Sequence, residues 1–355
     1  MMDTTFVEIA MNKTLEELNT SIPNGAEDAV RSQVLWGVVG IIILLLGLST
    51  NVFVIFAIVH SKQMRASPTY ILIVNLSINN GPVHSLFLAF DCYGWFTGKW
   101  NLGEPFCAFI GCATFLVLAS SGLCLMCITV QRYIYIVWFV KHITLCNPTT
   151  EKIVYVVCSI TCYVLPLLIL LPVLTGTVGK AGFDPYRQRC TILQSESAEF
   201  RNTFLVVFIC FPNFSMIYCF THISVSVFLN RRRMININQA VRHQAQKMRQ
   251  NTKIAQMFGI CYLSFVVAIT PCFIVNVLQV DGALNSFYTE GTYVLIYSSS
   301  IVNPIVYALM NQTFRDAYKA MNLCRCFSVN RVAPVPLDTQ RGSMPLSSVY
   351  VPQHA

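Results

Sequence analysis

Hydrophobic positions along the chain fall into seven long blocks that contain no Asp, Glu, Lys or Arg. A helix needs about 20 apolar residues to cross the ~30 Å hydrocarbon core of a bilayer, because each residue adds about 1.5 Å. Every block is long enough, so the pattern predicts seven transmembrane helices. The charge-free blocks are residues 32–61, 66–90, 105–131, 153–179, 202–230, 254–280 and 291–314.

Two other folds fit this pattern poorly. Core helices of a large soluble protein usually keep a charged face, and strands of a membrane barrel are ~10 residues long with alternating polarity. We therefore predict an all-α membrane protein, a seven-transmembrane helix bundle with a short amphipathic helix after span seven. The expected parts are an outer tail 1–33, a membrane domain 34–325 with spans 34–59, 69–90, 106–133, 153–178, 202–229, 254–280 and 291–310, an amphipathic helix 312–323, and a disordered cytoplasmic tail 326–355.

The distribution of charge predicts the orientation of the bundle. The chain is 55% hydrophobic and 11% charged, whereas soluble domains are ~25% charged. With the N-terminus outside, the inner segments hold 17 Lys and Arg against three acids, and the outer segments hold seven against 13. Lys and Arg collect on the cytoplasmic side. The net charge of +8 therefore reports membrane topology, and no nucleic-acid partner is expected.

Cysteines and glycosylation motifs agree with this orientation. Cys107 and Cys190 fall in outer segments, where an oxidising environment lets them pair. The outer tail has sequons at Asn12 and Asn19 but no cleavable signal peptide. On the cytoplasmic side, two cysteines just past span seven are predicted to be palmitoylated, with unmodified surface thiols as the alternative. That pair is Cys324 and Cys326.

Short motifs recur at the expected place in successive spans. The motifs are Gly47-x-x-x-Asn51, Asn75-Leu76-Ser77-x-x-Asn80, Cys107, Gln131-Arg132-Tyr133, Pro212, Pro271, Asn303-Pro304-Ile305-Val306-Tyr307 and Phe314. Their order and spacing resemble the rhodopsin-like (class A) G-protein-coupled receptors over residues 34–325, with the melatonin-receptor-like group or an orphan relative as the nearest subgroup.

This resemblance implies a receptor at the plasma membrane that binds an extracellular ligand and activates heterotrimeric G proteins. Receptor kinases and arrestin are further implied partners, and the lipid bilayer surrounds the bundle. No catalysis, cofactor or metal is expected. The residues implied in activation and coupling are Gln131, Arg132, Tyr133, Val140, Pro271, Asn303, Pro304 and Tyr307.

Several positions depart from the family pattern. The acid that usually precedes the arginine is Gln131, and the inner end of span six, Asn251-Thr252-Lys253, has no acid either. Arg132 therefore lacks two charge-assisted restraints, and raised ligand-free signalling is expected. The acid that holds sodium in span two is Asn80. A neutral interior network of Asn51, Asn80 and Asn303 is expected to bind a cation weakly.

Aromatic positions differ as well. The tryptophan before the span-six proline is missing from Ala268-Ile269-Thr270-Pro271, and the span-five tyrosine is Phe220. Tyr307 is therefore expected to lack a hydroxyl partner there. The span-four tryptophan is also absent, and Cys162 or Tyr163 stands near its place.

The ligand pocket implied by the resemblance lies between the outer halves of spans three, five, six and seven. We expect no acid in any span, which disfavours an amine ligand. Span seven also has no Lys, which disfavours retinal. A neutral or lipid-like small molecule remains, or a peptide held by loop charges such as Arg187 and Arg189. The expected lining is Thr114, Phe115, Leu118, Phe204, Phe208, Ile269, Phe273, Asn276, Tyr293 and Tyr297.

Two other functions are alternatives to a receptor. A transporter usually carries ionisable side chains inside the membrane, and His84 is the candidate found deep in a span. The departures around Arg132 leave open a seven-helix ligand-binding or scavenging protein with weak or no G-protein signalling.

Overall fold

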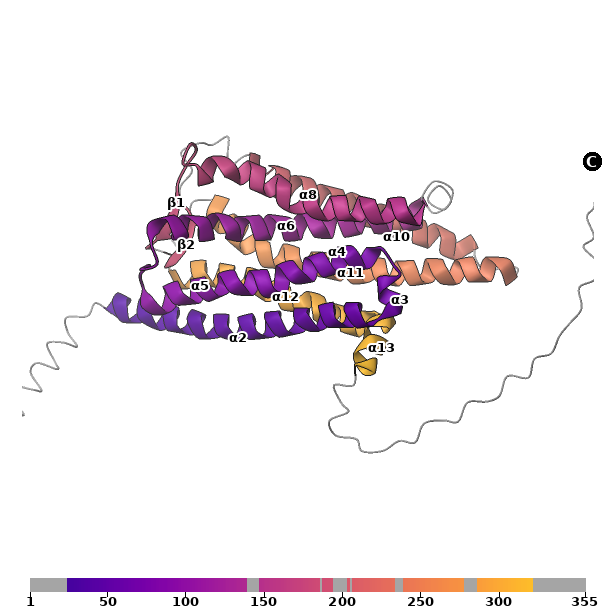
Figure 1. Cartoon of the computed structure of the whole chain (residues 1–355), viewed down its shortest axis with the longest axis horizontal. Helices are drawn as coiled ribbons and strands as arrows, with labels where there is room; N and C mark the ends of the chain where they lie inside the picture. The colour runs from indigo at the N-terminus through magenta and orange to yellow at the C-terminus, as the bar shows by residue number, and fades with distance from the viewer. Residues whose placement is uncertain are drawn as a thin grey trace, which may run out of the picture. The chain divides into compact units, whose positions relative to one another are not determined.

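The computed structural model describes residues 24–138, 147–185, 187–193, 203–204, 206–233, 239–277 and 286–321. Seven of its helices are long and apolar enough to cross a membrane, and they run alongside one another in Figure 1. The predicted seven-helix bundle with a short helix after span seven is confirmed. The helices are α2 (Asn24–His60), α3 (Lys62–Arg65), α4 (Thr69–Ile78), α5 (His84–Thr97), α6 (Glu104–Val137), α8 (Pro148–Leu174), α10 (Phe211–Arg233), α11 (Gln239–Val277), α12 (Ser286–Met310) and α13 (Gln312–Ala320).

Local signals explain where several helices begin and end. The side chain of Asn147 accepts a hydrogen bond from the Thr149 amide at the start of α8, and Asn311 does the same for Thr313 in α13. Such caps satisfy amides that have no partner inside the helix. Helix α5 ends at Gly98, whose left-handed backbone (φ 65°) suits glycine. Span two contains a proline, and a π-helical turn at Asn79–Val83 accommodates it between α4 and α5.

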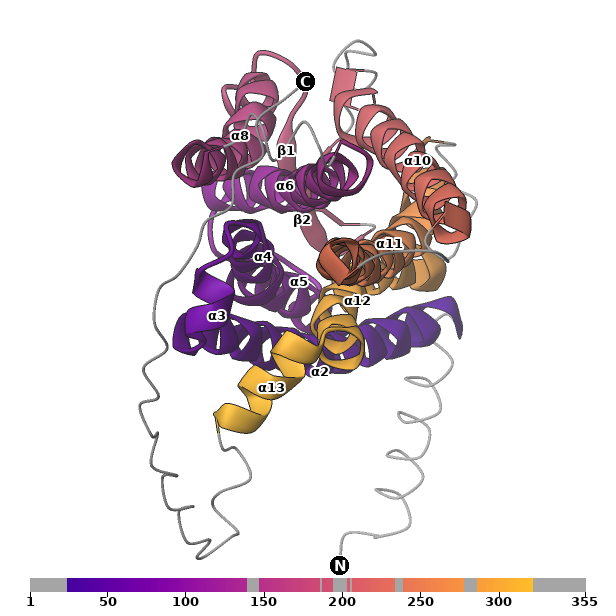
Figure 2. The same cartoon turned by 90° about the vertical axis from the view of Figure 1, so that its right-hand side faces the viewer.

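Helix α6 occupies the middle of the bundle. It contacts α4, α5, α8, α10 and α11, and Figure 2 shows it surrounded by several of them. The inner half of the core is built from large buried side chains on different helices, among them Leu76, Ile128, Phe258 and Tyr307. Outward-facing side chains of the outer helices are apolar and exposed, such as Leu168 on α8 and Phe214 on α10, as expected of surfaces that face lipid.

The two ends of the bundle carry different short elements. A hairpin of strands β1 (Ala181–Asp184) and β2 (Arg189–Ile192) lies at one end, and α13 lies at the other (Figure 1). The strands are antiparallel, with Phe183 opposite Cys190 and Asp184 opposite Arg189. On the predicted topology the hairpin is extracellular and α13 is cytoplasmic. Phe314 anchors α13, because its buried ring stacks on Tyr307 with centroids 5.3 Å apart.

Candidate functional site

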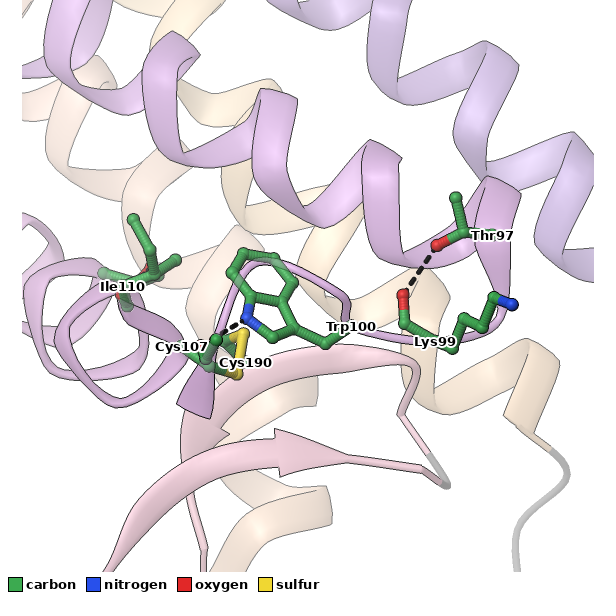
Figure 3. The surroundings of a disulfide bond; sticks show 8 residues. Thr97, Lys99, Trp100, Cys107, Ile110 and Cys190 are labelled. Carbon is green, nitrogen blue, oxygen red and sulfur yellow. Dashed lines mark hydrogen bonds between the residues drawn. A yellow bond between two sulfur atoms is a disulfide. The ribbon is translucent and has the colours of Figure 1, made fainter. Parts of the chain in front are cut away.

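The hairpin is fastened to the outer end of α6 by a disulfide. Cys190 of β2 is bonded to Cys107 in the first turn of α6, which confirms the pairing expected from the sequence. Both residues are buried, and they cluster with Ile110 and Trp100. Figure 3 shows Trp100 beside the disulfide, between spans two and three. The bond therefore holds the loop between spans four and five across the outer end of the bundle.

Two glycines let the hairpin approach the helices closely. A Cβ atom on Gly94 of α5 would lie 2.2 Å from the carbonyl oxygen of Gln188, and one on Gly111 of α6 would lie 2.9 Å from the backbone of Thr191. Real Cβ contacts are not that short, so any larger residue would push the strand outward. The hairpin is thus seated directly on the backbones of spans two and three.

Arg189 of β2 reaches into the bundle and binds an acid there. Its Nη2 atom lies 3.0 Å from Oδ2 of Asp91 on α5, and the two side chains are 2% and 1% exposed. Tyr297 of α12 donates a hydrogen bond of 2.7 Å to the same oxygen, and the guanidinium lies 3.9 Å from the ring centroid of Tyr293. This arrangement joins the loop to spans two and seven.

The surroundings of Arg189 favour its charged form. Burial opposes the charge, but the Asp91 carboxylate and the two tyrosines outweigh that effect and raise the pKa of the guanidinium above its usual value. A paired, hydrogen-bonded arrangement is what a charge needs when it leaves water. Arg189 is therefore a permanently charged anchor of the outer loop.

The expectation that no span contains an acid is wrong. Span two continues to Thr97 and includes Asp91, while span seven begins at Phe287 and includes Glu290. Glu290 is fully buried, and neither of its carboxylate oxygens has a hydrogen-bond partner in the part of the chain that the structure describes. Because a charged side chain just beyond a charge-free block can still belong to the helix, the count of charges ended span two too early and started span seven too late.

The two loop arginines are not the free charges that the sequence predicted. Arg189 forms an ion pair with Asp91, and Arg187 forms one with Asp184 of the same hairpin at 2.7 Å. The idea of a peptide held by these two arginines therefore loses its basis.

Part of the predicted pocket lining comes together in one cluster. Leu118 of α6 and Ile269 of α11 pack against Cys272, Tyr293 and Ile296. Because Tyr293 also lies over Arg189, this cluster is continuous with the anchor of the hairpin.

The other predicted lining residues are spread over neighbouring positions. The rings of Phe115 and Phe204 are 5.7 Å apart, and those of Phe204 and Phe208 are 4.8 Å apart. The Thr114 hydroxyl bonds to the Ile110 carbonyl within α6. Phe273 is half-buried on α11.

Some predicted site residues lie outside the described part of the chain. Asn276 falls within α11, but its side chain is not described. The glycosylation, coupling and palmitoylation predictions at Asn12, Asn19, Val140, Cys324 and Cys326 lie outside the described residues and stay predictions.

The three interior asparagines are not hydrogen-bonded to one another in the described structure. Asn51 donates to the carbonyl oxygens of Gly47 and Ser300, at 2.8 and 3.1 Å. Asn80 accepts a hydrogen bond of 2.9 Å from Ser121. Oδ1 of Asn303 has no hydrogen-bond partner within the described residues. The network predicted for these asparagines thus consists, in this structure, of links from span one to seven and from span two to three.

Sodium is expected to leave the stability of this protein unchanged. The position that would carry the family's sodium-binding acid is a neutral amide hydrogen-bonded to Ser121, so a cation gains little there. The thermal unfolding midpoint should be equal in sodium and choline chloride at matched ionic strength. An Asn80→Asp variant should gain about 1 kcal/mol at sodium concentrations several times its Kd. A sodium-dependent midpoint in the unaltered protein would contradict this.

Arg132 lies at the inner end of α6 and is 4% exposed. Its neighbour Gln131 donates a hydrogen bond of 2.8 Å to the Thr69 hydroxyl on α4 and makes no charged contact with the arginine. The guanidinium instead lies 5.6 Å from the ring centroid of Tyr135. Tyr133, which follows Arg132, accepts a hydrogen bond from the Trp138 indole.

A cavity of about 300 Å³ opens beside Arg132 between the inner ends of several helices. Its walls come from α4, α6 and α11 and from the turn into α13. The lining comprises Gln63, Ser67, Thr69, Tyr70, Ile73, Arg132, Tyr135, Gln250, Asn251, Ile254, Asn311 and Thr313.

The predicted movable elements lie around this inner core. Pro271 is inside α11 and Pro304 inside α12, and each removes one helical hydrogen bond. Tyr307 is fully buried, and its hydroxyl has no hydrogen-bond partner among the described residues, as expected from Phe220. The ring of Phe220 stacks on Tyr262 instead, with centroids 5.9 Å apart.

Tyr163, one of the two residues near the place of the missing span-four tryptophan, links two spans. Its hydroxyl donates a hydrogen bond of 2.7 Å to Oδ1 of Asn75 on α4. This bond joins spans two and four.

The chain is similar throughout its membrane domain to known receptors. The family model described as 7 transmembrane receptor (rhodopsin family) matches residues 50–307. Protein trapped in endoderm-1 of Drosophila melanogaster is 24% identical, over 82% of this chain and 78% of that protein. The Tachykinin-like peptides receptor 99D of Drosophila melanogaster is 25% identical, over 86% and 64%, and the Melatonin receptor type 1A-A of Danio rerio is 27% identical, over 78% and 77%. Squid rhodopsin shares the fold, with a TM-score of 0.68 and 16% identity over 82% and 87% of the two chains.

Proposed function

The chain belongs to the seven-transmembrane receptors of the rhodopsin family, and we propose that it couples an extracellular ligand to heterotrimeric G proteins at the plasma membrane. Members of this family are receptors and not enzymes. The observation that carries the proposal is the inner cavity, in which the buried Arg132 faces residues of α4 and α11. An outward movement of span six would widen this cavity and expose the arginine to a partner.

The ligand is proposed to bind at the outer end, beside the hairpin. Leu118 and Ile269 of the predicted pocket pack against Tyr293, which lies against Arg189, and Tyr297 shares the Asp91 carboxylate with Arg189. Thr114 stands in the place of the acid that binds amines in relatives, and Asp91 is already neutralised by Arg189. We therefore keep the three proposed ligand classes: a non-amine small molecule, a lipid-like molecule or a peptide.

Glu290 distinguishes among these classes. It is a buried acid whose carboxylate oxygens have no hydrogen-bond partner in the described structure, and an unpaired carboxylate in such surroundings is costly. A basic group on a ligand would supply the missing hydrogen bonds, and among the three proposed classes a peptide with a basic side chain carries such a group. This feature favours a peptide over the other two classes.

The inner end is proposed to bind the G protein through Arg132 and Tyr133, with Val140 as an apolar contact in the second inner loop. Pro271 and the segment Asn303-Pro304 to Tyr307 are proposed as the elements that change packing on activation, since proline allows a helix to bend. A ligand acts on such a bundle by binding one packing better than the other. Receptor kinases and arrestin are proposed as partners of the cytoplasmic segments.

Arg132→Ala is expected to reduce G-protein activation at least tenfold, because the arginine is the buried charge facing the inner cavity. The measurement is a panel of nucleotide-exchange assays, one for each G-protein class, in cells with matched surface expression. Activation that survives in Arg132→Ala would remove the arginine from the mechanism. An absence of exchange with every class would favour the silent ligand-binding alternative.

A further inference from the structure

We propose that Glu151, at the inner end of α8, is the acid that restrains Arg132, and that it acts through the ring of Tyr135. This inference rests on the proposed function and assigns the restraint to a residue on span four. In the sequence, Glu151 stands out only as an acid in a basic inner segment.

Glu151 gathers two tyrosines from different helices. The hydroxyls of Tyr135 on α6 and Tyr155 on α8 both donate to Oε1 of Glu151, the second at 2.7 Å. Tyr135 stands three residues after Arg132, so both side chains lie on one face of α6. The carboxylate therefore fixes where the Tyr135 ring lies.

The Tyr135 ring in turn holds the guanidinium. Arg132 lies over this ring at 5.6 Å, within the range of a cation–π contact. A phenol that donates to a carboxylate becomes more electron-rich, because linked polar groups polarise one another. The hydrogen bond to Glu151 therefore strengthens the attraction between the ring and Arg132.

The described acids on the inner face leave Glu151 as the candidate for this role. Gln131 is neutral and bonded to Thr69, and α11 contains no acid along Gln239–Val277. The described inner segments have one further acid, Asp316, and it is exposed on α13. Nε of Arg132 has no hydrogen-bond partner among the described residues, so the tyrosine ring is the contact that orients it.

This placement changes how the restraint is released. In the family pattern an acid beside the arginine or on span six holds it, and the movement of span six breaks the second contact. Here the restraint joins spans three and four, so it breaks when the inner end of α8 shifts or the Tyr135 ring turns. Gln131 alone predicts raised ligand-free signalling, whereas this proposal predicts signalling that is restrained through Glu151.

Glu151→Gln is expected to raise Arg132-dependent nucleotide exchange without ligand by about threefold to tenfold, the range of a lost cation–π contact. Tyr135→Phe should have the same direction, since it keeps the ring but loses the bond to Glu151. The matched control is Lys152→Gln, which removes the exposed charge next to Glu151 and should leave exchange unchanged. Adding Gln131→Glu to Glu151→Gln should restore the low level, because it returns an acid to Arg132.

A second measurement separates this restraint from the proposed function. Spin labels at two exposed positions, Arg65 of α3 just before span two and Lys253 at the inner end of span six, report the distance between these sites in purified protein in lipid nanodiscs. Glu151→Gln should enlarge the population with the longer distance, and the added Gln131→Glu should reverse it. If the distances respond but no variant drives exchange, the restraint stands and the proposed signalling fails. If exchange depends on Arg132 but Glu151→Gln changes neither readout, the restraint is overturned.

Discussion

Arg189→Ala is expected to lower the free energy of unfolding by about 3–5 kcal/mol, the usual cost of removing one partner of a buried ion pair. The variant leaves the Asp91 carboxylate 1% exposed with no cation to bind. It also removes the contact with the Tyr293 ring. Both losses act at the junction of the hairpin with spans two and seven, so the outer end should loosen.

Arg187→Ala is the matched control. Arg187 belongs to the same hairpin and also has an acidic partner, but the side chains of this pair are 11% and 15% exposed. This pair is less buried than that of Arg189 and joins two residues of one hairpin, so its loss should cost less than the loss of Arg189. Thermal and denaturant unfolding in one detergent gives both values. Equal losses in the two variants would show that burial of Arg189 does not set its contribution.

A double substitution tests the origin of the effect. Asp91→Leu with Arg189→Met replaces both charges by apolar side chains, which in buried pairs is often neutral or stabilising. Most of the stability lost in Arg189→Ala should therefore return. If the double variant is as unstable as the single one, the uncompensated charge would not explain the loss, and a contact that both variants lack, such as that of the guanidinium with the Tyr293 ring, would explain it.

The sequence predicted the membrane architecture because hydrocarbon imposes one rule on every span. A charge-free block long enough to cross the bilayer can be recognised without knowing which helices it packs against. The two outer cysteines likewise share the compartment in which thiols oxidise. The disulfide between Cys107 and Cys190 could therefore be predicted without a structure.

The acids at the two ends of the bundle could not be assigned in this way. Asp91 directly follows a charge-free block, which predicts an outer connection, yet its helix continues to Thr97. Its partner Arg189 is 98 residues further along the chain, so only the fold brings the pair together. The role proposed for Glu151 could not be predicted from the sequence either. Only the fold brings the hydroxyls of Tyr135 and Tyr155 to its carboxylate and the Tyr135 ring to Arg132.

Loss of the disulfide is expected to be the other large effect on stability. The bonded cysteines are 83 residues apart, and a cross-link over a loop of that size restricts the unfolded chain by about 4–5 kcal/mol in the entropic model. Cys107→Ser should therefore lower stability by a comparable amount and reduce the protein at the cell surface. Cys210→Ser is the control, because Cys210 is a free, partly buried cysteine.

The disulfide and the ion pair should not act independently, because they are made by adjacent residues of β2. Cys190 fixes the strand to α6, while Arg189 fixes it to α5 and α12. Once Cys107→Ser frees the strand, part of the population already has Arg189 withdrawn, so adding Arg189→Ala should cost less than it does alone. Unfolding of the two single variants and the double variant gives this coupling, which for neighbouring sites is about 0.5–3 kcal/mol. Additive losses would mean that each anchor seats the hairpin without the other, and the outer loop would then be held by two separate attachments.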